Sequence, residues 1–171
     1  SLLLIALMVG CMSASAQKFD KNELRQLQSF LSQPGEKAAT NAEALKITDL
    51  KNPATWEGVT VANGRVTAIE WGDKHLAGEL NLSGFKALTK VNVSRNALTS
   101  LNIDGDAAIT RLDAQRNKLS GVSLDGCTGL KTLNIYKNRI TEFTLTGTPI
   151  IETVNISNNY LVALDVANST S

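Results

Sequence analysis

Residues 88–171 divide into four aligned copies of 21 residues: LTKVNVSRNALTSLNIDGDAA (88–108), ITRLDAQRNKLSGVSLDGCTG (109–129), LKTLNIYKNRITEFTLTGTPI (130–150) and IETVNISNNYLVALDVANSTS (151–171). Apolar residues recur at the same offsets in each copy, and an asparagine follows the first apolar cluster. A period of roughly 20 to 50 residues indicates units that stack, because one unit cannot bury its apolar face alone. The sequence therefore predicts a solenoid.

The repeated pattern can be written L-x-x-L-x-L-x-x-N-x-L-x-x-L-x-L, and it resembles the leucine-rich repeat. An irregular first unit of 22 residues, which contains Val66, Ile69 and Trp71, precedes the four copies. We therefore expect five repeats, at 66–87, 88–108, 109–129, 130–150 and 151–171. The asparagines at one fixed place in each copy are expected to point inward and bond the backbone; they are Asn96, Asn117, Asn138 and Asn159.

A second apolar pair in each copy alternates as a strand does, with Leu101 and Ile103 as one example. This alternation predicts a second parallel strand on the back of each coil in place of a helix. Residues that tolerate positive φ follow the pair and predict the return turn; they are Gly84, Gly105, Gly126, Gly147 and Asn168. The short unit resembles those of bacterial cell-surface proteins, including the internalin-like group.

Residues 17–65 interrupt the repeat and are expected to form an N-terminal cap. Apolar residues at 24, 27, 30 and 31 follow helical spacing, with Asp20 as the predicted N-cap and Glu23 three residues later. Pro34-Gly35 ends this helix, and 38–50 carry a second, weaker helical pattern.

The cap also resembles the segment that precedes plant-type leucine-rich repeats, because Trp56-Glu57-Gly58-Val59 is followed by Gly64-Arg65-Val66. Val61 stands where that family carries a cysteine, so we expect no cap disulfide and a larger sealing role for Trp56. The predicted fold class is a leucine-rich-repeat horseshoe: a right-handed β-solenoid with a parallel front sheet, short back strands and a helical N-terminal cap.

Residues 1–16 are uncharged and mostly apolar, and they end in Ala14-Ser15-Ala16. This pattern predicts a secretory signal peptide that is clipped at its start. It is too short for a membrane span, which needs about 20 apolar residues. Two alternatives stay open: a lipid anchor at Cys11, which follows Met8-Val9-Gly10, and a buried core helix. We expect a secreted, cell-surface or periplasmic protein of bacterial type that is truncated at the C-terminus.

Composition argues against several function classes. The 171 residues carry a net charge of +1, which gives no general attraction to nucleic acid or to a membrane surface. The two cysteines cannot build a disulfide framework, and Cys127 is interpreted as a free, unactivated thiol. The single histidine, His75, has no adjacent nucleophile, and a metal site with Glu70 and Asp73 is the weaker interpretation. We therefore expect no catalytic activity, cofactor or metal.

Function is expected on the outward positions of the front sheet, which alternate with the core positions along each strand. The middle repeats gather cations and one aromatic residue there; they are Lys90, Arg95, Arg111, Arg116, Lys137 and Tyr136. Acidic residues fall instead on the back; they are Asp104, Asp125, Glu142 and Asp165. One interpretation is a solvated basic surface, and the other is a binding face for an acidic protein surface or an anionic glycan.

The leading hypothesis is a non-catalytic protein–protein interaction module. Arginine suits this role because its planar guanidinium bonds both oxygens of a carboxylate or sulfate. The alternative is a glycan-binding or structural spacer module that carries a functional domain beyond Ser171.

Overall fold

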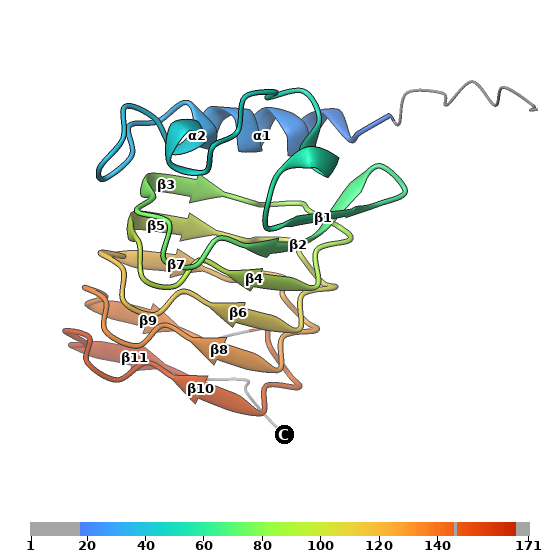
Figure 1. Ribbon diagram of the computed structural model, residues 1–171. Coiled ribbons are helices and arrows are strands. Elements are labelled where there is room, and N and C mark those ends of the chain that lie inside the picture. Colours follow the sequence, from blue (N-terminus) through green and yellow to red (C-terminus); the bar gives the residue numbers. More distant parts are fainter. Residues whose placement is uncertain (1–17, 146, 167–171) are drawn as a thin grey trace, which may run out of the picture.

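The computed structural model describes residues 18–145 and 147–166, which form a β-solenoid with helices at its N-terminal end (Figure 1). The predicted signal peptide at 1–16, the lipid-anchor alternative at Cys11 and the last member of the turn column, Asn168, lie outside the described residues. The observed fold is the one predicted from the repeat: a solenoid of leucine-rich-repeat type with parallel strands on both sides.

One strand from each coil joins a continuous front sheet in the order β1-β2-β4-β6-β8-β10. The strands are β1 (Val59–Ala62), β2 (Arg65–Glu70), β4 (Lys90–Asn92), β6 (Arg111–Asp113), β8 (Thr132–Asn134) and β10 (Thr153–Asn155). β1 and β2 form an antiparallel hairpin, and every later pair is parallel. Lys90 pairs with Arg111 and Arg111 with Thr132, so equivalent residues of neighbouring copies lie side by side.

The back strands confirm the prediction of strands in place of helices. They are β3 (Ala77–Asn81), β5 (Ala97–Asn102), β7 (Gly121–Ser123), β9 (Glu142–Thr144) and β11 (Ala163–Asp165). They do not form one sheet, because β3-β5-β7 make a three-stranded sheet and β9-β11 a separate parallel pair. Across residues 18–145 and 147–166, the front is thus continuous and the back is divided between β7 and β9.

Apolar columns between the two sheets form the core. The inward leucines at 112, 119, 130 and 133 are fully buried, and so are their counterparts in the copy at 88–108. The last copy is less covered, and Val154 is 38% exposed. Each return turn passes through a glycine at φ between 73° and 78°, as predicted, because this left-handed region favours a residue without Cβ. These glycines are Gly84, Gly105, Gly126 and Gly147.

The repeated asparagines are internal and bond the backbone of two coils, as predicted. Nδ2 of Asn117 donates to the carbonyls of Val93 and Ala114 at 2.9 and 3.1 Å. Its Oδ1 accepts from the N–H of Leu98 at 3.0 Å. Asn138 repeats this arrangement one coil later, with the carbonyls of 114 and 135 and the N–H of 119. Each asparagine therefore ties its own coil to the preceding one.

Helix α1 (Lys21–Leu31) covers the first coil, and its N-cap is Asp20, as predicted. Glu23 does not complete a capping box. Its carboxylate instead binds the Arg65 guanidinium at 2.8 Å and accepts from the N–H of Val66 at 2.9 Å. The predicted helical pattern over 38–50 is too long, because α2 spans only Asn41–Ala44.

Trp56 follows the short 3-10 helix η1 (Pro53–Thr55) and is 3% exposed. Its indole N–H donates to the carbonyl of Asp49 at 2.7 Å. In the same core cluster, the rings of Phe30 and Trp71 stack with centroids 6.0 Å apart, so aromatic packing closes this end of the core.

Candidate binding surface

The structure places all six predicted site residues on or beside the front sheet. Lys90 and Arg111 begin β4 and β6 and are paired in register. Arg95, Arg116 and Lys137 lie where the front strands end, one per coil. The N–H groups at 95, 116 and 137 each donate to a carbonyl of the following coil at 2.8 to 3.0 Å. Two rows of cations therefore run across the strands at the spacing of adjacent strands, about 5 Å.

The cations at the strand ends have a backbone conformation that the sequence did not predict. Arg95, Arg116 and Lys137 have φ of 55° to 56°, the left-handed region that side chains other than glycine rarely adopt. Asp73 and Asn158 occupy the same place in the flanking coils with the same φ of 56°. Because the backbone conformation repeats, the Cα–Cβ bonds of all five residues have the same orientation in their coils.

The column between the two rows has a structural role that sequence reasoning missed. Asn92 accepts from the N–H of Ser94 at 3.1 Å, and Asp113 accepts from the N–H of Gln115 at 3.3 Å. Asn134 and Asn155 repeat this bond to the residue two places later. These Asx turns position the following left-handed residue, so the column supports the cations. The recurrence of Asn or Asp two residues before each turn was the available signal.

Three of the predicted site residues have side-chain partners within the surface. Lys90 forms an ion pair with Glu70, so part of its charge is neutralised. The Arg116 guanidinium carbon lies 5.6 Å from the centre of the Tyr136 ring, and Asn158 Nδ2 donates to the Tyr136 hydroxyl at 3.0 Å. Tyr136 therefore joins two coils and holds one arginine over its face. Arg95, Arg111, Arg116 and Lys137 remain exposed.

Other sequence candidates for chemistry fall elsewhere. His75 lies near Glu36 and Lys37 of the cap, at 3.4 Å from each. Among the described residues no group of three or more His, Cys, Asp or Glu side chains could hold a metal ion. Cys127 is buried and its Sγ bonds the Ile103 carbonyl at 3.2 Å. Burial raises the pKa of the Cys127 thiol to about 12, as expected for an unactivated cysteine.

Within the part of the chain that the structure covers, no helix has the length and apolar character of a membrane span.

Comparison with known proteins defines the fold. No protein-family model matches this chain, and no curated protein matches it either. The chain resembles the crystal structure of the BIR2 ectodomain from Arabidopsis thaliana, with a TM-score of 0.60 and 20% identity over 90% of this chain and 98% of that one. The leucine-rich-repeat ectodomain of the receptor kinase SOBIR1 from the same plant gives a TM-score of 0.47 and 18% identity, covering 86% and 98%. The chain is a β-solenoid of leucine-rich-repeat type.

Proposed function

We propose that this protein is a non-catalytic recognition module that binds the acidic surface of a partner protein through its front sheet. The observation that carries this proposal is the double row of exposed cations on a continuous sheet. Arg111 starts one front strand, and Arg95, Arg116 and Lys137 follow the front strands of three successive coils. Carboxylates on a partner would meet cationic side chains whose backbone is already held in one conformation.

The rigidity of the surface favours binding. The Asx turns fix the backbone at the ends of the front strands, and the buried asparagines hold each coil to its neighbour, so little backbone entropy is lost when a partner docks. Cations spaced along one face also accelerate association with an acidic partner, and this acceleration weakens as salt rises. Tyr136 adds a rigid aromatic surface beside Arg116.

The same proposal places the protein outside the cell. The BIR2 structure that this chain resembles is an ectodomain, and residues 1–16 have the sequence pattern of a secretory signal. A short-repeat module of a secreted or cell-surface protein fits both observations.

The proposal is tested with immobilised poly-L-glutamate as the acidic polypeptide and heparin as the anionic glycan, measured by biolayer interferometry at low and physiological salt. One variant carries Arg95→Glu, Arg116→Glu and Lys137→Glu. The control carries Lys18→Glu, Lys21→Glu and Lys51→Glu, exposed positions on the cap that change the net charge equally.

We expect the front-sheet variant to bind poly-L-glutamate at least about tenfold more weakly, since several charge-assisted contacts are lost. The control variant should bind as the wild type does. Equal losses of binding in both variants would mean that only the net charge of the protein matters, which would contradict the proposal. Binding to heparin but not to poly-L-glutamate would favour the glycan alternative.

A further inference from the structure

The back of the solenoid is interrupted at one place. Between β5 and β7, the N–H of Ser120 donates to the Thr99 carbonyl at 3.1 Å, and the N–H of Ile103 donates to the Ser123 carbonyl at 3.1 Å. Between β9 and β11, the equivalent bonds run from 162 to 141 and from 145 to 165, both at 2.8 Å. Neither counterpart forms between β7 and β9 in residues 18–145 and 147–166. The N–H groups of Thr141 and Leu124 and the carbonyls of 120 and 144 thus face a split.

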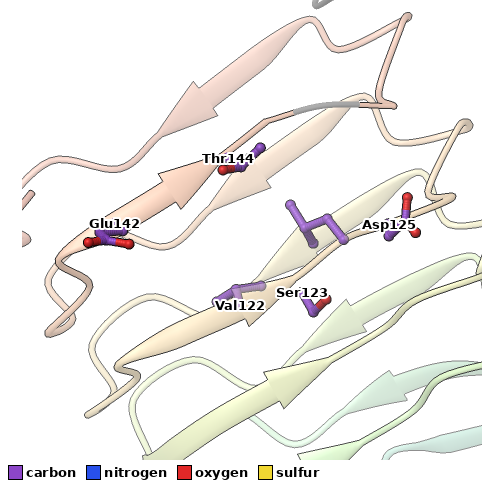
Figure 2. A pocket seen from close by; sticks show the side chains of 6 residues that line it. Val122, Ser123, Asp125, Glu142 and Thr144 are labelled. Carbon is purple, nitrogen blue, oxygen red and sulfur yellow. The ribbon is translucent and has the colours of Figure 1, made fainter. Parts of the chain in front are cut away.

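A cavity of about 390 Å³ occupies this split. Figure 2 shows its lining, with Glu142 and Thr144 on β9, Ser123 on β7 and Asp125 in the turn that follows β7. Val122, which the figure also labels, is half-buried there. A Cβ added to Gly121 would meet no atom within 4 Å, so the space above β7 is open.

The two carboxylates in the split lack the partners that an equivalent residue has. Asp104, one coil before Asp125, accepts from the Ser123 hydroxyl at 2.7 Å and from the N–H of Asp125 at 2.8 Å. In the described part of the chain, neither the Asp125 carboxylate nor the Glu142 carboxylate has a hydrogen-bond or ion-pair partner. The lining contains no Lys or Arg, so its charge is wholly negative.

We propose that this split is a docking site for an extended peptide segment of a partner that carries two basic side chains four residues apart. Glu142 and Asp125 lie toward opposite ends of the split (Figure 2). The repeat aligns Glu142 with Gly121, four residues before Asp125, which corresponds to about 13 Å along a strand. In an extended peptide, side chains at positions one and five point to the same face and span this distance.

The chemistry of the split favours a peptide over a small cation. The unpaired groups at the ends of β7 and β9 include both donors and acceptors, and an extended backbone supplies both kinds alternately. A metal ion would leave the N–H groups without partners. The apolar stem of a lysine or arginine can lie on Val122 while its charged end reaches a carboxylate. The acidic split lies on the opposite side from the basic front sheet, so the two sites are independent.

The test is an NMR titration of the ¹⁵N-labelled protein with acetyl-Lys-Thr-Val-Thr-Lys-amide. Two control peptides carry Gln in place of both Lys residues or place the Lys residues at positions one and four, on opposite faces. We expect the amide signals of Leu124 and Thr141 to shift with the first peptide and not with the controls.

Isosteric variants separate this site from general charge. Asp125→Asn and Glu142→Gln should each weaken binding about fivefold, the effect of one exposed ion pair. The matched control Glu79→Gln, on β3 of the same side, should bind as the wild type does. The front-sheet variant with Glu at 95, 116 and 137 should also bind normally, which distinguishes this proposal from the proposed function.

Absence of shifts at 124 and 141 would overturn the proposal, as would equal binding of the Lys and Gln peptides. Equal affinity for wild type and both split variants would overturn it as well.

Discussion

The front and back of this solenoid are built from the same repeats but differ in regularity. At the front, an asparagine copied in the four later coils completes the hydrogen bonding, as Asn117 does for Val93 and Leu98. At the back, the same residue bonds differently from coil to coil: the Asp104 carboxylate joins its coil to the next, whereas the Asp125 carboxylate has no partner among the described residues. A sheet stays continuous where every coil supplies the same bond, and it opens where one coil departs from the pattern.

The comparison is tested most strongly by removing one copied asparagine. Asn117→Ala leaves the buried N–H of Leu98 without its partner and removes one of the two amide donors at each of the carbonyls of Val93 and Ala114. The lost bonds and the unpaired N–H together should lower the free energy of unfolding by about 4 kcal/mol. Asp104→Ala, at the back, breaks only exposed bonds and should cost about 1 kcal/mol. Urea denaturation monitored by circular dichroism measures both. Equal losses would mean that the front is no more dependent on its side chains than the back.

A second test concerns the return turn that leads from the back to the front. Asp106 is buried there, in the position that Cys127 and Thr148 occupy in later coils, and neither carboxyl oxygen has a hydrogen-bond partner among the described residues. Burial raises the pKa of Asp106 to about 8. The nearby backbone N–H groups of Phe85 and Gly84 act in the opposite direction, although neither forms a hydrogen bond with the carboxyl group.

The sign of the pH effect follows from this shift. The folded pKa of Asp106 lies above its ordinary value of 3.8, so the folded state binds the proton more tightly than the unfolded state. The stability of the wild type should therefore fall as pH rises from 5 to 8, with a contribution of roughly 3 kcal/mol. Asp106→Asn, which cannot titrate, should lose this contribution. Denaturation curves at pH 5 and 8 decide the matter, and parallel pH profiles for the two proteins would contradict it.

The smallest expected effect concerns the left-handed residues that carry the front cations. Lys137→Gly should raise the free energy of unfolding by about 1 kcal/mol, because glycine adopts φ of 55° without steric cost. Lys131→Gly, six residues earlier at a position outside the positive-φ set, should lower it by about 1 kcal/mol. Thermal unfolding of the two variants supplies the measurement. Opposite signs would show that the cation at 137 is retained at a cost in stability.

Most of the architecture followed from periodicity. The spacing of Leu112, Leu133 and their counterparts predicted the core, and the alternation around Leu101 predicted the back strands. The buried role of Asn117 was also predicted, because its donors and acceptor match the groups at a turn. The length of α2 was not predicted. Only the four residues after Thr40 are helical, and the rest of the apolar pattern over 38–50 lies outside a helix.

The candidate surface was predicted in position but not in mechanism. Periodicity placed Arg95, Arg116 and Lys137 in one row, whereas their left-handed φ depends on the Asx turn that precedes them. The ion pair of Lys90 with Glu70 likewise depends on the pairing of β2 with β4, which brings these two side chains from neighbouring strands into contact.

By itself, the sequence determined the repeat, the strand on each side of the coil and the columns of like residues, because each of these follows from spacing along the chain. The tertiary structure alone decided which columns are continuous. Whether a hydrogen bond forms between adjacent coils depends on how closely their strands approach each other. The split between β7 and β9 has no periodic signature in the sequence. The front cations are regular features of the repeat, whereas Glu142 has no acidic counterpart at its place in the other copies, and only packing left Asp125 and Glu142 without partners at an open edge.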